Sequence, residues 1–164
     1  MVKEMKSILS EAEAVNAIQE YRKDGGKVVT TNGTFDILHL GHVKVLEQAK
    51  SEGDVLIVLL NSDISVRENK GPKRPIVPQD ERAKMLLALR CVDYVMIFDD
   101  KEVADLLSRL KPDIHAKGGT YIPERVRKEQ EVMESFGGEW VHFDELPGHS
   151  TTNLIDKVLE VYGK

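Results

Sequence analysis

The sequence predicts an α/β fold in which helices cover both faces of a doubly wound, parallel, five-stranded sheet. Short apolar segments rich in Val, Ile and Leu are typical of buried strands, and they occur at 27–31, 55–60, 94–98, 114–117 and 139–143. Apolar residues at helical spacing lie between them, at 42–51, 78–89, 102–110 and 123–136. Strict alternation of strands and helices, joined by right-handed crossovers, indicates a parallel sheet whose ligands bind beyond the carboxyl ends of the strands.

The pattern of the first 26 residues predicts one further helix, and the length and composition of the chain predict a single domain. Ser10 and Glu13 have the spacing of a capping box, apolar residues recur through 14–21, and Asp24-Gly25-Gly26 would end a helix at about Lys23. We therefore expect an N-terminal helix within 1–26 and a core at 27–164. A chain of 164 residues with 41% hydrophobic content is long enough to bury one substantial core.

One segment lacks periodicity. Residues 67–79 contain three prolines, one glycine and four basic residues in no regular pattern. Such composition predicts a mobile surface loop.

Composition narrows the function classes. The net charge of -5, with no basic run, argues against a nucleic-acid groove built on phosphate contacts. No apolar run approaches the ~20 residues that cross a bilayer, and the N-terminus is not that of a secretion signal. The one cysteine, Cys91, lies among apolar residues and predicts a buried, inert thiol. We expect a cytoplasmic protein that does not bind membranes.

The most informative segment is 31–42, with the sequence TNGTFDILHLGH. It follows a β-branched strand, turns at Gly33 and enters an apolar-periodic helix, which places His39 and His42 three residues apart around Gly41. The first N–H groups of a helix and its dipole attract anions, so this junction predicts a phosphate site. Both imidazoles would then face one group of phosphate oxygens.

A second phosphate site is predicted at 148–153, with the sequence GHSTTN, which precedes the last apolar-periodic helix. A helix cap uses one hydroxyl, and Ser150, Thr151 and Thr152 offer three. Two helix N-termini would thus converge on one polyanion.

These motifs resemble the HxGH-motif nucleotidyltransferases, the cytidylyltransferase-like superfamily that includes glycerol-3-phosphate cytidylyltransferase. The resemblance covers nearly the whole chain and extends to Asn61-Ser62-Asp63, Lys70-Gly71, Arg74-Pro75, Arg82, Val92-Asp93-Tyr94, Lys117-Gly118-Gly119 and Ser150-Thr151-Thr152-Asn153. It implies a Rossmann-like sheet and transfer of a nucleotidyl group to a phosphorylated acceptor, with Mg²⁺ arriving on the nucleoside triphosphate. It also implies a homodimer.

The site residues follow from the chemistry and the resemblance together. His39, His42 and Lys70 are the expected catalytic groups, since nucleotidyl transfer needs positioning and charge neutralisation. The other expected nucleotide contacts are Thr34, Phe35, Gly118, Gly119, Tyr121, Ser150, Thr151 and Thr152. The expected acceptor contacts are Asp36, Asp63, Lys70 and Arg82. For the two aspartates a turn or cap role stays open, as does a simple turn for the glycine pair.

Within the superfamily the chain is most similar to the D-glycero-D-manno-heptose 1-phosphate adenylyltransferase branch. It lacks the arginine that glycerol-phosphate cytidylyltransferases carry before the final helix, and it has the KGG run, Tyr121 and Asn153. That branch implies AMP transfer from ATP to heptose 1-phosphate for lipopolysaccharide core synthesis, here by a stand-alone transferase. A cytidylyltransferase for glycerol 3-phosphate and a non-catalytic nucleotide-binding module are the alternatives.

Overall fold

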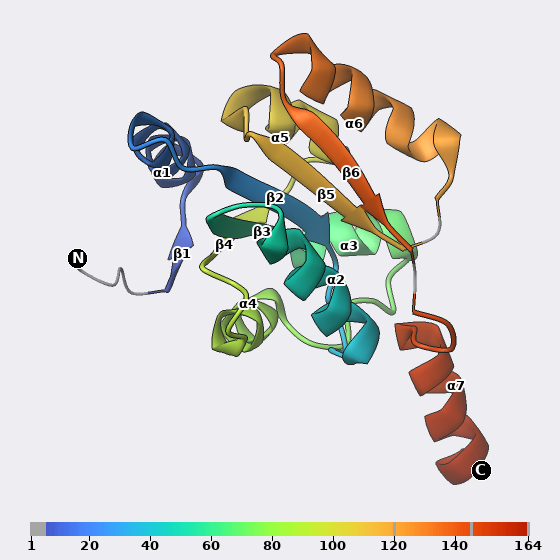
Figure 1. The fold of residues 1–164 in the computed structure, drawn as a ribbon. Helices are drawn as coiled ribbons and strands as arrows, with labels where there is room; N and C mark the ends of the chain where they lie inside the picture. The colour runs from blue at the N-terminus through green and yellow to red at the C-terminus, as the bar shows by residue number, and fades with distance from the viewer. Residues whose placement is uncertain (1–5, 120, 145, 164) are drawn as a thin grey trace.

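A computed structural model describes residues 6–119, 121–144 and 146–163 and contains a parallel six-stranded sheet in the order β1-β4-β3-β2-β5-β6. The strands are β1 (Ser7–Leu9), β2 (Val28–Gly33), β3 (Val55–Asn61), β4 (Tyr94–Phe98), β5 (Ile114–Gly118) and β6 (Glu139–Phe143). The helices are α1 (Glu11–Lys23), α2 (Leu40–Ser51), α3 (Asp63–Lys70), α4 (Gln79–Ala88), α5 (Val103–Leu110), α6 (Pro123–Ser135) and α7 (Thr151–Tyr162). Figure 1 shows the helices on both sides of the sheet, which confirms the doubly wound α/β fold.

Alternate residues of the central strands build two separate cores. Ile57 and Leu59 face one core with α1, α5 and α6, whereas Leu56 and Val58 face the other with α2 and α4. All four side chains are fully buried. The period of two along each strand therefore explains why β3 is apolar throughout, since both of its faces are covered.

Two elements were missing from the sequence prediction. The sheet has six strands rather than five, because Ser7–Leu9 adds to its edge by pairing with β4. The predicted loop at 67–79 is wrong for 67–70, which form the end of α3. A three-residue strand and an eight-residue polar helix are too short to give a clear hydrophobic period. The Ser10–Glu13 capping box is confirmed.

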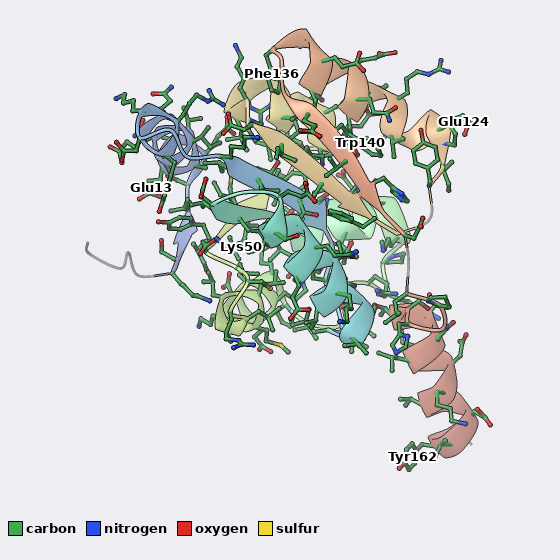
Figure 2. The ribbon with its side chains drawn as sticks, viewed as in Figure 1. Glu13, Lys50, Glu124, Phe136, Trp140 and Tyr162 are labelled. Atoms are coloured by element: carbon green, nitrogen blue, oxygen red, sulfur yellow. The ribbon has the colours of Figure 1, made fainter. Side chains whose placement is uncertain are left out.

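The last helix, α7, extends away from the sheet (Figure 1), and none of its residues is buried. Tyr162, near its far end, is 79% exposed (Figure 2). Its N-terminus lies at the carboxyl edge of the sheet, near the start of α2 (Figure 1), and residues of both helix starts line one cavity. None of the helices in the described parts of the chain has the length and apolar character needed to cross a membrane.

The strand order places the ligand crevice at the ends of β2 and β5. From β2 the chain moves to β3 and β4 on one side, and it later returns to β5 on the other. In doubly wound sheets a crevice opens at this switch point, beyond the carboxyl ends of the strands. Gly33 and Gly118 are the last residues of these two strands.

A buried arginine joins the segments that border this crevice. Arg82 of α4 is 1% exposed, and its guanidinium donates to the backbone oxygens of Thr34 at 2.6 Å, Asn61 at 2.9 Å and Val77 at 2.9 Å. It also pairs with the Asp63 carboxylate at 2.7 Å. One side chain thus holds the β2–α2 turn, the end of β3 and the start of α3. The structure therefore places both predicted acceptor contacts, Arg82 and Asp63, in an ion pair with each other, and Arg82 is too buried to reach a ligand.

Asp36 also points into the protein rather than toward a ligand. The residue is 2% exposed, and its carboxylate pairs with the Arg74 guanidinium and accepts hydrogen bonds from the N–H groups of Ile76 at 2.8 Å and Val77 at 2.9 Å. The predicted acceptor contact at Asp36 is therefore replaced by the turn-type role left open above. Its effect is to fix the 71–78 segment against the β2–α2 turn.

We predict that Arg82→Met lowers the free energy of unfolding by about 3–5 kcal/mol, because it leaves a carboxylate and three carbonyl groups without their donor. Urea denaturation followed by circular dichroism measures the loss. Arg109→Met is the matched control, since Arg109 pairs with Glu11 and Asp100 at a 41% exposed side chain and should cost less than about 1 kcal/mol. Equal losses in the two variants would contradict the role given to Arg82.

Candidate functional site

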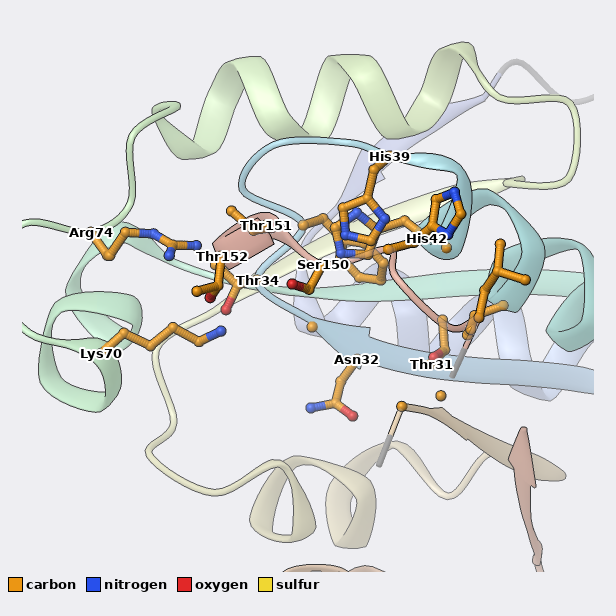
Figure 3. Close-up of a pocket in the computed structure, with 18 residues that line it drawn as sticks. Thr31, Asn32, Thr34, His39, His42, Lys70, Arg74, Ser150, Thr151 and Thr152 are labelled. Atoms are coloured by element: carbon orange, nitrogen blue, oxygen red, sulfur yellow. The ribbon is translucent and has the colours of Figure 1, made fainter. Parts of the chain in front are cut away.

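A cavity of about 300 Å³ lies at the predicted edge of the sheet (Figure 3). It brings together ten of the residues predicted from the sequence: Thr34, Phe35, His39, His42, Lys70, Gly118, Gly119, Ser150, Thr151 and Thr152. These come from the ends of β2 and β5, the first turns of α2 and α7, and the end of α3. We call it the nucleotide cavity.

The two histidines stack on one another in this cavity. The ring centroids of His39 and His42 are 3.7 Å apart with an angle of 24° between planes, and the edge of Phe35 meets His42 at 5.1 Å. Gly41 allows this packing: an added Cβ would lie 3.0 Å from the His39 ring and 3.2 Å from the Cβ of His149. The glycine of the HLGH motif therefore suits the close approach of the start of α2 to the segment that carries His149.

The His42 imidazole is neutral at physiological pH. Burial first, and then the nearby His39 and Lys70, lower the pKa of His42 from 6.5 to about 4. A neutral ring has one N–H donor and one acceptor. Its Nδ1 atom is buried and has no hydrogen-bond partner among the described residues. A buried polar atom of this kind is satisfied when a ligand or water occupies the cavity.

The start of α7 forms the opposite wall. Ser150 is the N-cap, and its Oγ accepts a hydrogen bond from the N–H of Asn153 at 3.0 Å. Thr151 and Thr152 follow in the first turn and line the cavity. The cap thus uses one hydroxyl, as predicted, while the first turn and its threonines face the cavity. Because α2 also starts here, two helix N-termini with free donors and positive dipole ends meet at one site.

Two cations complete the cavity. Lys70 and Arg74 enter from the side opposite the histidines (Figure 3). Burial, followed by repulsion from Arg74, lowers the pKa of the Lys70 ammonium, and Asp36 counteracts this shift. Arg74 is held in place by its ion pair with Asp36. A phosphate chain in this cavity would therefore meet positive charge at one end and helix dipoles at the other.

The glycine pair at the end of β5 lines the cavity, and glycine suits each of the two positions for a different reason. A Cβ on Gly118 would lie 2.4 Å from Cγ1 of Val45 in α2, so this glycine is required for packing of α2 on β5. Gly119 has a φ of +105° and open space around it, a conformation that glycine adopts without strain. The predicted role for both, contact with the nucleotide, stays a prediction.

Tyr121 lies outside this cavity. Its ring is 46% exposed and packs edge-on against His142 at 5.2 Å. Six further lining residues were not predicted from the sequence, namely Thr31, Asn32, Val45, Arg74, Leu146 and His149. Thr31, Asn32 and His149 lie within the two predicted phosphate motifs, and Arg74 is a basic residue in the proline-rich segment 67–79.

The described residues contain no cluster of three or more His, Cys, Asp or Glu side chains that could hold a metal ion. Among the described residues, the cavity lining offers imidazoles, hydroxyls, an amide and cations, without a carboxylate. Mg²⁺ binds oxygen and keeps several waters when it accompanies phosphates. The Mg²⁺ ion expected to arrive on the nucleoside triphosphate stays a prediction.

Comparison with known proteins decides the family. The profile of the Cytidylyltransferase-like family matches residues 30–157. The chain belongs to this family. The family expected from the GTFD and HLGH motifs is therefore confirmed, and the match spans the starts of both α2 and α7.

Relatives of this cytidylyltransferase-like chain are larger proteins. It is 51% identical over 147 residues to "Bifunctional protein HldE" of Geobacter metallireducens, which covers 90% of this chain and 30% of that protein. The match to the protein of the same name from Rhodopseudomonas palustris is 47% identical over 157 residues and covers 96% and 32%. The chain thus spans about 30% of the length of these curated relatives.

Two solved structures share the fold. A lipopolysaccharide core biosynthesis protein from Thermoplasma volcanium is 29% identical, with a TM-score of 0.64 over 74% of this chain and 99% of that one. Pantoate-beta-alanine ligase from Francisella tularensis is 16% identical, with a TM-score of 0.61 over 96% of this chain and 80% of that one. The second likeness shows the fold alone.

We predict that the ring protons of His42 titrate in NMR spectra with a midpoint near 4, because the buried ring resists protonation. ATP should raise this midpoint, since phosphate charge favours the imidazolium. His42→Asn identifies the resonance. A midpoint near 6.5 in the free protein, or no change with ATP, would contradict the geometry of the site.

Proposed function

We propose that this chain transfers AMP from ATP to heptose 1-phosphate, releasing pyrophosphate and forming the ADP-heptose used for lipopolysaccharide core. The observation that carries the proposal is the convergence of the stacked His39–His42 pair, the α2 and α7 N-termini, Lys70 and Arg74 on one cavity. This arrangement suits a triphosphate, and the family gives it nucleotidyl-transfer chemistry.

In the proposed reaction an oxygen of the acceptor phosphate attacks the α-phosphorus of ATP. The bond between that phosphorus and the α–β bridging oxygen breaks, and pyrophosphate departs with the electron pair. The attacking phosphate oxygen is already ionised, so the step needs no general base. Catalysis then rests on alignment and on stabilising negative charge as it moves toward the leaving group.

Each part of the cavity has a role in this step. The N–H groups of His39 and His42 donate to phosphate oxygens whose charge increases in the transition state. The start of α7 holds the β- and γ-phosphates with Ser150, Thr151 and Thr152. Lys70 and Arg74 neutralise charge between the acceptor and the departing pyrophosphate. Mg²⁺, when it arrives with ATP, neutralises part of the phosphate charge.

The choice of ATP and heptose 1-phosphate rests on the resemblance described for the sequence. It is supported by the relatives, whose name marks them as bifunctional, and by the likeness to the lipopolysaccharide core biosynthesis protein of Thermoplasma volcanium. The cytoplasm, where ATP is abundant, is the proposed location. The homodimer stays a prediction.

A pyrophosphate-release assay tests the substrate assignment. ATP, CTP, GTP and UTP are each combined with heptose 1-phosphate, glycerol 3-phosphate or choline phosphate in the presence of Mg²⁺. We expect ATP with heptose 1-phosphate to be the productive pair. Turnover only with CTP and glycerol 3-phosphate would replace the substrate assignment, and release with no pair would favour a non-catalytic nucleotide-binding module.

His42→Ala is predicted to lower kcat by roughly 10²-fold or more, on the scale of removing one transition-state donor. The far-ultraviolet circular dichroism spectrum should stay that of the parent protein, because the ring faces a cavity. Steady-state kinetics with the productive pair measures the effect. Turnover close to that of the parent protein would remove His42 from the mechanism.

A further inference from the structure

A second cavity, of about 610 Å³, adjoins the nucleotide cavity. The two share Asn32, Thr34 and Lys70 in their linings. The second cavity reaches from the ends of β2, β3 and β5 to α3, α5 and α6. A ligand in it would therefore lie beside whatever group occupies the far end of the nucleotide cavity. We call it the acceptor cavity.

The lining of the acceptor cavity combines groups that bind hydroxyls with groups that bind phosphate. Three asparagine amides, four lysine ammonium groups and three glutamate carboxylates of the described chain line it, among them Asn32, Lys70, Lys117 and Glu129. Amides and carboxylates are suited to a polyhydroxyl chain, and ammonium groups to a phosphate. The nucleotide cavity, in contrast, has no carboxylate among the lining residues that the structure describes.

One ion pair in this wall is held rigidly. Glu129 of α6 is 6% exposed, and its carboxylate accepts from Lys117 Nζ at 2.8 Å and from Trp140 Nε1 at 3.3 Å. His115 Nε2 lies 3.8 Å from Oε2 of Glu129. Burial, however, lowers the pKa of His115 well below 6.5. Because that ring is neutral, Lys117 is the cation that balances Glu129.

Lys117 in turn fixes the orientation of Asn32. Its Nζ donates to Asn32 Oδ1 at 2.8 Å. An ammonium group can only donate, so the amide must turn its oxygen toward Lys117 and its nitrogen away. Figure 3 shows that nitrogen on the side on which Lys70 lies. The two N–H bonds of Asn32 Nδ2 are thereby presented at the boundary shared by the two cavities.

We propose that the acceptor cavity binds a phosphorylated polyhydroxyl acceptor, and that the Lys117–Glu129 pair orients Asn32 so that Nδ2 donates to the acceptor phosphate. This inference rests on the proposed function for the identity of the reaction. Asn32 is then a specificity-determining contact, and Lys117 and Glu129 are positioning residues. The hydroxyls of the acceptor lie toward α3, α5 and α6.

The chain contains a built-in reporter for this cavity. Trp140 is the one tryptophan in the sequence, and its indole N–H is bonded to Glu129. Its fluorescence should change when an acceptor contacts the Lys117–Glu129 pair. The experiment titrates heptose 1-phosphate into protein saturated with α,β-methylene ATP, whose methylene bridge prevents transfer. Glucose 1-phosphate, glycerol 3-phosphate, inorganic phosphate and unphosphorylated heptose are titrated in parallel.

For Asn32→Ala we expect the Kd and KM for the acceptor to rise about 10-fold or more, on the scale of a hydrogen bond to a charged group, with the KM for ATP changed less than about 3-fold. Lys117→Met should shift the acceptor constants in the same direction. Lys157→Met removes a lysine from an exposed ion pair on α7 and is the matched control, expected to equal the parent protein. Asn32→Ala keeps the inference testable if Lys117→Met does not fold.

The outcomes separate this inference from the proposed function. If heptose 1-phosphate is adenylylated and both variants keep the parent acceptor KM, the acceptor-cavity inference is wrong while the function stands. If no acceptor is adenylylated but a sugar phosphate changes Trp140 fluorescence in a manner lost in Asn32→Ala, the cavity assignment stands and the function is wrong. Equal loss of ATP and acceptor affinity in both variants would overturn the positioning role.

Discussion

The buried Arg82 guanidinium is the interaction on which the geometry of the site depends. Its partners belong to three segments that are far apart in sequence: the turn after β2, the end of β3 with the start of α3, and the end of the 71–78 segment. The β2–β3 ladder aligns the ends of these strands up to Gly33 and Leu60, and Arg82 joins the turn that carries Thr34 to the start of the helix that ends at Lys70. A buried charge outside the cavity lining thus helps to set the distance between Thr34 and Lys70.

The groups that line the nucleotide cavity favour anions, and the ligand supplies the negative charge. The nucleotide cavity holds a neutral His42, a Lys70 whose pKa is lowered by burial, and helix dipoles from α2 and α7. In a partly buried cavity these groups interact strongly with a polyanion, because little water screens them. The nearby carboxylate of Asp36 is turned inward and paired with Arg74, so it positions a cation and does not repel the phosphate chain.

Sequence reasoning succeeded where local pattern decides structure. The β-branched strands, the Ser10–Glu13 box and the starts of the helices after His39 and Ser150 are local signals, and the structure contains all of them. It failed where tertiary contacts decide. Arg82 and Lys70 are both basic residues that follow the HLGH motif in the chain. Only tertiary packing buries Arg82 in the protein and places Lys70 in the nucleotide cavity. The contact of Asn32 with Lys117 joins strands 85 residues apart in the chain, and no local spacing indicates it.

A crystal structure of the protein with α,β-methylene ATP measures the central claim directly. We expect the triphosphate to lie between the His39–His42 stack and the first turn of α7, with imidazole nitrogens and Thr151 or Thr152 within about 3.2 Å of phosphate oxygens. Lys70 should lie beside the α-phosphate, on the side of the acceptor cavity. A triphosphate bound elsewhere, or one that leaves both imidazoles without a phosphate contact, would contradict the assignment of this site to nucleotidyl transfer.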